Sequence, residues 1–416
     1  MVNGPSSADL RAGGGAHVMS GGVGASPDSG HPETAGEKLC VRDAPRVIGD
    51  LGRDRAGPML VCIGSLHGNE PAGFLALRRV FKKLGPGPEG LEGLEGRFVG
   101  LTGNRKALAV GQRFLELDLN RAWTPERIDR VRRTTEALVA EDDELRELSL
   151  ELDFLLEDGR DAMVLDLHST SGGGPAFTNL DDTLRNRRFA FRIPVPHVLG
   201  LEEELAGTLA GHLNERRIVA IGFEAGQHAD PRAVDRAEAA VWIALEHSGV
   251  LRPGTRPEVD RALRSLRKEH APFPNVVEVR YRHAVEPGDG FAMLPGFTTF
   301  QRVRRGQELA REPAGPVTAC ESGRILMPLY QGQGEDGFFL VREVQYAWLR
   351  LSAVLRRLGA DRFLHWLPGV RRHPGRPRTY VVDRRRARWL ARQVFHLLGY
   401  RRAAEDGVVL TMTRRD

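Results

Sequence analysis

The chain has 416 residues, 41% of them hydrophobic and 28% charged, so it is long enough for two or three globular domains. No apolar run approaches the ~20 residues of a transmembrane helix, so we expect no membrane-bound form. The net charge of +5 is concentrated in residues 371–402, which hold eleven Arg against one acid. The remainder is net negative, so a general nucleic-acid surface is not expected.

Residues 1–42 are rich in Gly, Ser, Ala and Pro and lack a basic start followed by an apolar stretch. They therefore do not read as a secretory signal, and we predict a disordered tail. The three cysteines, Cys40, Cys62 and Cys320, have no paired spacing. This usage favours a reducing compartment, and we expect a cytoplasmic protein without a disulfide scaffold or a cysteine zinc site.

The first predicted domain, residues 43–262, alternates strands with helices, which indicates a layered α/β architecture. The strands are expected within 44–64 and at 97–103, 162–168 and 218–223. The helices are expected at 72–83, as two helices within 125–157, and from the cap at Asp230-Pro231 to about Ser248.

A small β domain, barrel or sandwich, is predicted for residues 263–345, with no helix after about residue 262. Short β-favouring runs separated by Gly and Pro carry that prediction, at 276–282, 298–303, 324–328 and 337–342. Residues 346–416 are predicted to form a helical, Arg-rich extension.

The first motif lies at the end of a predicted buried strand, Met59–Gly64, where His67 and Glu70 follow a Gly-Ser break. An imidazole and a carboxylate three residues apart can bind one divalent metal. The spacing alone is weak support, because it occurs twice more, at His212/Glu215 and His283/Glu286. Its position after a buried strand distinguishes the first pair.

Polar groups follow several predicted strands, and ligands of α/β sheets bind at the carboxyl ends of strands. These groups are His67 with Glu70, Asn104, His168 and Glu224. Two imidazoles and one carboxylate suit zinc, and three protein ligands leave the open fourth position of a catalytic site. The sequence therefore predicts one catalytic zinc held by His67, Glu70 and His168.

Other polar residues have candidate catalytic roles. Glu224 ends an apolar strand and is the candidate base for water at the metal; an ion pair with a neighbouring Arg is the alternative. Arg113 is a candidate donor to the oxyanion, and Asn120 with Arg121 could hold a substrate carboxylate. For both arginines the alternative is a solvated surface position.

Two further residues have open roles. Asp166, two residues before His168, either orients that ligand or caps a loop, and His228 either lines the pocket or is structural. The Ser- and Gly-rich run 169–174 lacks the Lys and the spacing of a Walker phosphate loop.

Taken together, the motifs resemble the succinylglutamate desuccinylase/aspartoacylase family of zinc-carboxypeptidase-like enzymes, over roughly residues 45–345. They occur in the family's order: His-Gly-Asn-Glu-Pro-x-Gly (67–73), Gly-Asn (103–104), Arg-x(4)-Asp-Leu-Asn-Arg (113–121), Asp-Leu-His-Ser-Thr (166–170) and Glu-x-Gly (224–226).

The resemblance implies a zinc-dependent amidohydrolase that removes an acyl group from an N-acyl amino acid. It places the zinc ligands at His67, Glu70 and His168, and the catalytic glutamate at Glu224. It also makes Arg113 the residue that polarises the scissile carbonyl and Asn120 with Arg121 the substrate-binding pair. A further family Arg before the catalytic Glu could correspond to Arg216 or Arg217. Segments 125–158 and 346–416 have no assigned counterpart.

We therefore predict a cytoplasmic zinc hydrolase acting on the linear amide of a small N-acyl amino acid. A zinc carboxypeptidase acting on peptides is the first rival. The second is an idle scaffold or a nucleic-acid binder that uses Trp389, Phe395 and Tyr400 among the arginines of the extension. Against the nucleic-acid reading stands a basic amphipathic helix packed on the main body. The acyl group, the amino acid and the oligomeric state stay open.

Overall fold

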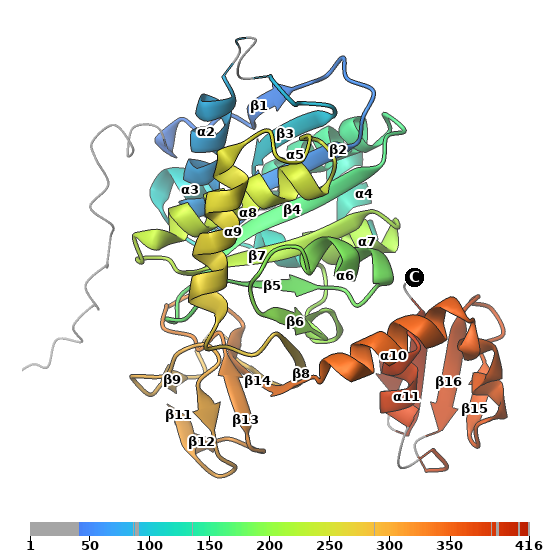
Figure 1. Ribbon diagram of the computed structural model, residues 1–416. Helices are drawn as coiled ribbons and strands as arrows, with labels where there is room; N and C mark the ends of the chain where they lie inside the picture. Colours follow the sequence, from blue (N-terminus) through green and yellow to red (C-terminus); the bar gives the residue numbers. More distant parts are fainter. Residues whose placement is uncertain are drawn as a thin grey trace, which may run out of the picture.

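The computed structural model describes residues 41–85, 87, 91–134, 136–286, 288–383, 385–387, 391–406 and 408–414. An α/β body, residues 41–345, is built on one eleven-stranded sheet, and a C-terminal unit, residues 346–414, has its own four-stranded sheet (Figure 1). The predicted tail, 1–42, lies outside the described residues apart from positions 41 and 42, which are helical.

Four parallel strands form the centre of the large sheet, and each was predicted from its apolar run. Every residue of two of them is buried, as expected when helices cover both faces of a parallel sheet. Their carboxyl ends meet at one edge of the sheet. In spatial order they are β3 (Arg97–Thr102), β2 (Met59–Gly64), β4 (Ala162–Thr170) and β7 (Val219–Gln227), with β1 (Val47–Leu51) antiparallel outside β3.

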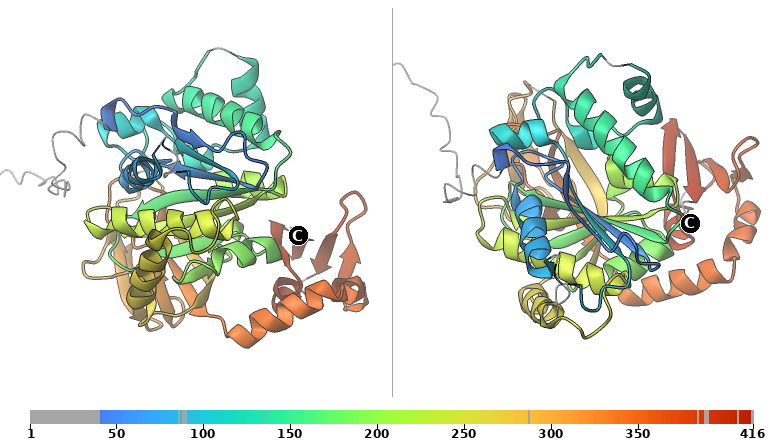
Figure 2. Two further views of the ribbon diagram at one scale, coloured as in Figure 1. Left: turned by 45° about the horizontal axis from the view of Figure 1, so that its top comes forward. Right: turned by 90° about the horizontal axis from the view of Figure 1, so that it is seen from above.

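Helices pack on both faces of these strands (Figure 2). Alternate residues of β2 serve the two layers: Leu60 and Cys62 belong to one apolar core, and Val61 and Ile63 to the other. The first layer contains α2 (Ala72–Leu84), α8 (Arg232–His247) and α9 (Pro257–His270); the second contains α4 (Pro125–Arg133), α5 (Ala140–Leu156) and α7 (Leu209–Glu215). None of the helices in the described part of the chain is long and apolar enough to cross a bilayer.

The large sheet continues past the predicted boundary at residue 262. Beyond β7 it adds two short strands that the sequence analysis did not assign, and the second of them pairs in parallel with β8. In order, the remaining strands are β5 (Phe177–Leu180), β6 (His197–Leu199), β8 (Val276–Ala284), β14 (Asp336–Glu343), β13 (Gly323–Leu326) and β10 (Arg302–Val303).

Helix α9 spans the predicted boundary, so the expectation of no helix after about residue 262 is wrong. Pro257 opens this helix, and Val259, Ala262 and Leu266 recur at helical spacing and are buried in the first core. Glu258 and Asp260 stand in its first turn and Arg267, Lys268 and His270 in its last, which suits the helix dipole. The helical period was therefore readable in the sequence.

A three-stranded sheet faces the last strands of the large sheet. An apolar cluster that includes Leu309, Ile325 and Phe338 lies between the two. The three strands are β9 (Ala292–Met293), β11 (Glu308–Glu312) and β12 (Gly315–Thr318). Short helical elements complete the body: α3 (Arg105–Val110), η1 (Leu119–Arg121), α6 (Leu184–Ala190) and η2 (Leu201–Glu203).

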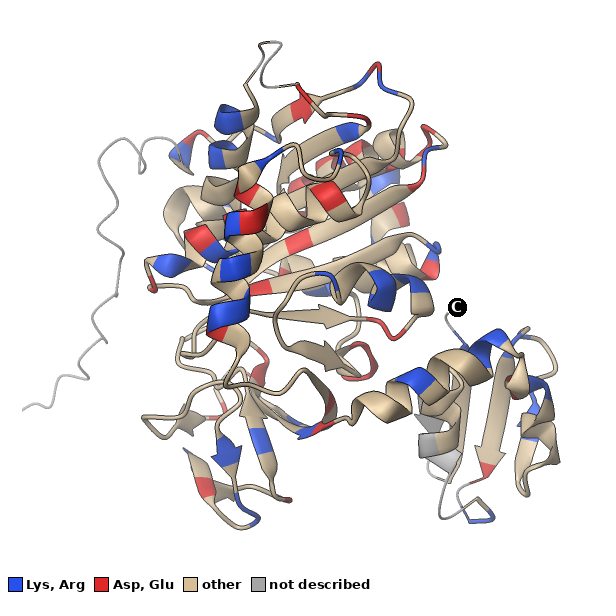
Figure 3. Cartoon of the chain, viewed as in Figure 1, with Lys and Arg blue, Asp and Glu red and all other residues tan. Residues whose placement is uncertain are grey.

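The C-terminal unit corrects the prediction of a helical extension, because it contains a sheet of order β15-β16-β18-β17. Tyr380 and Val382 of β16 and Leu410 and Met412 of β18 alternate inward onto a separate apolar core. Its arginines are spread over helix and strands (Figure 3). The elements are α10 (Tyr346–Arg357), η3 (Ala360–Trp366), β15 (Val370–Arg372), β16 (Thr379–Asp383), α11 (Ala391–Leu397), β17 (Tyr400–Asp406) and β18 (Val409–Arg414).

Candidate metal and catalytic site

A tight turn after β2 presents the first motif. Ser65 adopts a positive φ of 58°, and its hydroxyl donates to the carbonyl of Glu70 at 2.9 Å. Gly68 donates its amide to the carbonyl of Arg113 at 3.0 Å. A Cβ atom on Gly68 would lie 2.1 Å from the carbonyl carbon of Ala107, so the close approach requires glycine. The loop is thus held at both its ends and its middle.

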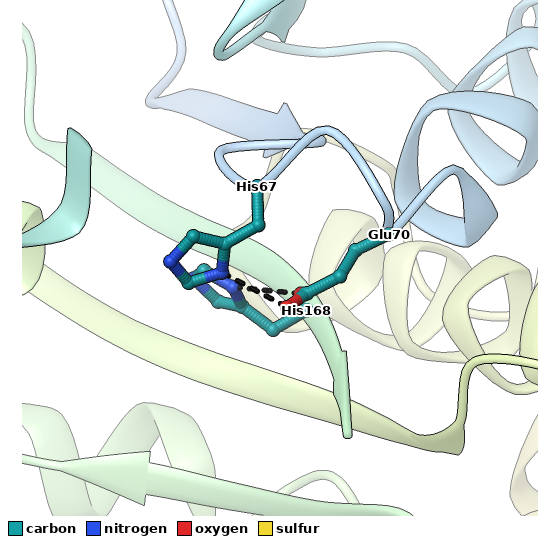
Figure 4. A group of neighbouring side chains, drawn as sticks. All are labelled: His67, Glu70 and His168. Atoms are coloured by element: carbon teal, nitrogen blue, oxygen red, sulfur yellow. Dashed lines mark hydrogen bonds and ion pairs between the residues drawn. The ribbon is translucent and has the colours of Figure 1, made fainter. Parts of the chain in front are cut away.

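The structure brings the three predicted metal ligands together (Figure 4). His67, Glu70 and His168 are buried, and one potential ligand atom of each lies within 4.8 Å of the others. Glu70 stands between the imidazoles, with Oε1 2.9 Å from His67 Nδ1 and Oε2 3.1 Å from His168 Nδ1. The amide of Ser169 donates to Oε2 at 2.9 Å, which orients the carboxylate.

The outer nitrogen of each imidazole meets a second carboxylate. His67 Nε2 lies 3.0 Å from Asp118 Oδ1, and His168 Nε2 lies 2.8 Å from Asp166 Oδ2. A carboxylate accepts, so each Nε2 carries a hydrogen, and the Nδ1 atom of each ring faces Glu70, where it can bind a metal once it has no proton. Asp166 therefore orients a histidine, one of its two expected roles. The contact of Asp118 with His67 was not predicted, because the two residues are 51 positions apart in the sequence.

The electrostatics of this cluster favour a cation at its centre. Burial opposes ionisation of Glu70, but His67 and His168 outweigh it and hold the pKa of Glu70 well below its usual value. Burial likewise opposes protonation of His168, but Asp166 and Glu70 raise its pKa well above the ordinary value. The cluster therefore favours positive charge beside the Glu70 carboxylate, carried either by protons on the imidazoles or by a bound cation. A divalent metal would supply that charge, so the donor set fits one.

Glu224 stands beside the cluster, on the strand next to His168. β7 continues through it to Gln227, so Glu224 lies within the strand and not at its end as expected. Asn179 Nδ2 donates to its Oε1 at 3.4 Å, while its Oε2 has no hydrogen-bond partner among the described residues. Burial raises the pKa of Glu224 to about 8, with Glu70 and Asp166 adding to the shift and His168 opposing it. Among the described residues Glu224 forms no ion pair with an Arg, which was the predicted alternative.

Arg113 is buried against the same cluster, with 14% of its side chain exposed, so the solvated alternative is wrong. Its Nη2 donates to Asp118 Oδ2 at 3.0 Å and its Nη1 to Glu70 Oε1 at 3.3 Å. Burial opposes its charge, but Asp118 and Glu70 outweigh burial and raise its pKa. A permanent cation therefore lines the pocket next to the metal ligands.

Asn120 and Arg121 also line the pocket, on η1. Asn120 Oδ1 accepts the amide of Leu209 at 3.0 Å. Arg121 Nη2 donates to Asp336 Oδ2 at 2.7 Å, so its charge is paired before any substrate arrives. Asp336 was not predicted as a pocket residue; it comes from β14, far along the chain.

The pocket is a cavity of about 130 Å³. Its walls are the metal cluster, the segments around β5 and η2, and a loop between β13 and β14 that includes Met327 and Gln331. That loop is tied across the pocket, because Asn69 Nδ2 donates to Gln331 Oε1 at 2.9 Å and Gln333 Nε2 to the Phe114 carbonyl at 3.1 Å. The segment that was predicted as a small β domain thus narrows the site.

Residues 56–246 match the model of the succinylglutamate desuccinylase/aspartoacylase catalytic domain. This part of the chain is a desuccinylase/aspartoacylase catalytic domain. The matched range includes the three predicted ligands and Glu224, and the match confirms the resemblance seen in the motifs. The domain is a hydrolase domain of that type. No curated protein matches the sequence.

Solved structures of this family are similar to the chain. A succinylglutamate desuccinylase/aspartoacylase from Rhodobacter sphaeroides is 20% identical, with a TM-score of 0.50 over 71% of this chain and 87% of its own. A desuccinylase from Chromobacterium violaceum gives 18% and 0.49, over 71% and 88%. The product-bound ectoine utilization protein EutE (DoeB) from Ruegeria pomeroyi gives 21% and 0.48, over 69% and 85%. The first shows that the mixed α/β fold with its large central sheet is shared.

Several polar residues of this desuccinylase/aspartoacylase domain lie outside the pocket. Asn104 accepts from Ala107 N at 3.1 Å and caps α3. Arg216 pairs with Asp153 at 2.5 Å, and neither it nor Arg217 lines the cavity. His228 stands behind the wall, with its Nδ1 2.7 Å from the hydroxyl of Ser169. His228 therefore contacts the pocket residue Ser169 but does not itself line the cavity.

The two other His-x-x-Glu pairs do not form metal clusters. The ring of His212 lies against Trp123, with centroids 5.8 Å apart, and His283 Nε2 pairs with Glu312 at 2.7 Å. Within the described residues, only the first pair joins a group of three potential ligands. Spacing alone was therefore a poor guide, and position after a buried strand was a good one.

Proposed function

We propose that this protein is a zinc-dependent amidohydrolase that removes the acyl group from a small N-acyl amino acid. One observation carries the proposal. A buried His67/Glu70/His168 cluster, oriented by outer carboxylates, lies beside the unpartnered oxygen of Glu224 in a domain of the desuccinylase/aspartoacylase type.

Zinc is the metal that this donor set favours. Two imidazole nitrogens and one carboxylate oxygen are typical of catalytic zinc, and three protein ligands leave a position open. When bound, the ion would polarise the amide carbonyl and lower the pKa of water. Asp118 and Asp166 would keep the two imidazoles in the tautomer that binds through Nδ1.

Glu224 is the proposed proton carrier. Glu224 lines the pocket, and its Oε2 has no hydrogen-bond partner among the described residues, so this oxygen is available to accept and release a proton there. Its Oε2 takes the proton from the attacking water and then gives it to the departing amine. Asn179, through its bond to Oε1, holds the other oxygen in place.

Arg113 and the η1 pair bind the substrate in this proposal. Arg113 faces the carbonyl oxygen that gains negative charge in the transition state, where a fixed cation is most effective. Asn120 and Arg121 anchor a substrate carboxylate, with Arg121 sharing its guanidinium between that carboxylate and Asp336.

The small volume of the pocket favours a small substrate over a peptide. A cavity of about 130 Å³ is below the ~300 Å³ at which drug-sized ligand sites begin. The loop that carries Gln331 crosses the site where a peptide cleft would have to stay open. These two features disfavour the carboxypeptidase alternative.

The first test is the zinc content of the full chain and of His168→Ala, measured together by elemental analysis. We expect about one zinc per chain, lost in the variant, because removing one of three ligands opens the site. Hydrolysis of N-acetyl-L-aspartate, N-succinyl-L-glutamate and short peptides would then be measured, with Glu224→Ala as the inactive control. A chain that takes up no zinc on titration would overturn the proposal and favour an idle scaffold.

A further inference from the structure

The C-terminal unit, which lies beyond the matched catalytic domain, contacts the α/β body through buried charges. Asp182, with 1% of its side chain exposed, is the centre of this contact. Its Oδ2 accepts from Arg356 Nη2 at 2.7 Å and from Arg401 Nη2 at 2.6 Å, and its Oδ1 accepts from Arg187. Two of the three arginines come from the C-terminal unit.

A second contact holds the segment around η2. Glu203 Oε1 lies 3.0 Å from Arg401 Nη1 and 3.2 Å from His396 Nε2. Arg402 adds three bonds: its amide to Glu203 Oε2 at 3.2 Å, and its Nη2 to the Glu203 carbonyl at 3.1 Å and to Glu204 Oε1 at 2.6 Å. Arg401 joins both contacts, because it binds Asp182 as well as Glu203.

The residues next to these anchors line the active-site pocket. Leu180 and Asp181 lie in the cavity wall, directly before Asp182. Leu201, Glu202 and Leu205 lie in the same wall and flank Glu203 and Glu204 in the sequence. Each segment therefore touches the substrate cavity on one side and the C-terminal unit on the other.

These wall segments have few backbone constraints of their own. β5 has four residues, β6 has three and η2 is a single turn of three. The short ladders of β5 with β7 and β6 are therefore supplemented by the arginine contacts. Because the arginines are buried and multiply bonded, they fix position as well as charge.

We propose that the C-terminal unit is a positioning element of the active site, in which Arg401 and its neighbours Arg356 and Arg402 hold the β5 and η2 segments where they form the substrate-contacting wall. The inference rests on the proposed function for the identity of the substrate, but not for the mechanical link. The arginines touch neither the metal ligands nor Glu224. Their loss should therefore weaken substrate binding more than it slows the chemical step.

The test compares the full chain with Arg401→Gln and Arg402→Ala. Arg402→Ala guards against a folding failure, because 21% of that side chain is exposed and it bonds to Glu203 and Glu204 of the η2 segment. Arg414→Gln is the matched control, since Arg414 pairs with Asp361 at 2.9 Å inside the C-terminal unit. Backbone hydrogen exchange is measured by mass spectrometry on peptides covering 177–183, 197–206 and the central strands.

We expect faster exchange in the 197–206 peptides of both variants, in the 177–183 peptides of Arg401→Gln, and in neither for the control. Peptides of β2 and β4 should be unchanged, and so should the zinc content. With whichever of N-acetyl-L-aspartate and N-succinyl-L-glutamate is cleaved, KM should rise on the order of tenfold in Arg401→Gln with kcat nearly constant.

Unchanged exchange at 197–206 in Arg402→Ala would overturn the proposal, and so would a fall in kcat at constant KM in Arg401→Gln. If neither substrate is cleaved by the unaltered chain, that result counts against these substrates of the proposed function. The exchange measurement still decides the positioning role, since it needs no turnover.

Discussion

Two buried networks of charged groups differ in how their charges are matched. Around the predicted metal cluster, Arg113 donates to Glu70 and Asp118, and two imidazoles direct Nδ1 toward Glu70. At the C-terminal unit, the carboxylate of Asp182 alone accepts from three arginines. We call the first network open, because potential metal-ligand atoms gather in it, and the second closed, because guanidinium groups surround its central carboxylate.

The difference indicates how a metal or catalytic site can be distinguished from a charged network that only holds two parts of the chain together. Both networks contain buried ionisable groups with shifted pKa values, so burial and shift do not separate them. What separates them is the kind of group that gathers: potential metal-ligand atoms in the first network, and guanidinium groups around one carboxylate in the second. Five predictions test this contrast, from the larger expected effects to the smaller.

Glu224→Gln should have the largest effect on the open network. Gln keeps the size of the side chain but cannot carry a proton, so kcat should fall by ~10²–10⁴-fold. Zinc content should stay at the level of the unaltered chain, because Glu224 is not a proposed ligand. Steady-state kinetics and elemental analysis on the same preparations measure both. A loss of zinc in this variant would instead make Glu224 a ligand.

Asp182→Ala should be the most damaging change in the closed network. It leaves Arg356 and Arg401 buried without their shared carboxylate, which costs about 3–5 kcal/mol in unfolding free energy when such pairs are broken. Urea denaturation of the full chain gives the value. Asp182→Asn is the matched variant and should lose less, because it still accepts hydrogen bonds. Equal stability of the Ala variant and the unaltered chain would contradict a stabilising role for the Asp182 network.

Asp118→Asn and Asp166→Asn should weaken metal binding without abolishing it. Each removes the charge that orients one imidazole through Nε2, and such outer partners are worth ~10–100-fold in metal affinity. Competition with a zinc chelator measures the affinity. Asp153→Asn, at a pair with Arg216 away from the pocket, is the control and should not change it. Unaltered affinity in both variants would mean that the carboxylates serve folding alone.

Lowering the pH should weaken the closed network, with a small effect on the stability of the folded chain. Burial opposes ionisation of Glu278, but His396 and Arg401 outweigh it and lower its pKa to about 2. A lowered folded pKa gives stability that is full above the ordinary value of ~4.3 and is lost as pH falls toward 2. The Tm difference between the chain and Glu278→Gln should therefore shrink between about pH 5 and pH 2. A difference that is constant over this range would exclude the contribution.

The stability contributed by His396 should depend on pH in the opposite direction. Burial and Arg401 oppose its protonation, but Glu203 and Glu278 outweigh them and raise its pKa. A raised folded pKa gives stability that is present below the ordinary value of ~6.5 and is lost as pH rises through the folded value. The Tm difference between the chain and His396→Gln, measured in the same way but extended above pH 6.5, should shrink as pH rises. This separates the contribution of His396 from that of Glu278.

The sequence by itself determined the central strands and the residues at their ends. Apolar runs specify buried strands, and the carboxyl ends of parallel strands meet at one edge, so His67 and His168 could be placed together without coordinates. Glu224 followed from the same rule, although β7 runs three residues further than predicted. Sequence patterns succeed here because periodicity and strand direction are local properties.

Only the tertiary structure decided the contacts that join distant parts of the chain. The bond of Asp118 to His67, the pairing of Arg121 with Asp336 and the anchoring of Asp182 by Arg401 link residues 51, 215 and 219 positions apart. Such pairings leave no periodic trace, because either partner would look like an ordinary surface charge in isolation. The strands of the C-terminal unit were different, since alternation in β16 and β18 was present but masked by the surrounding arginines.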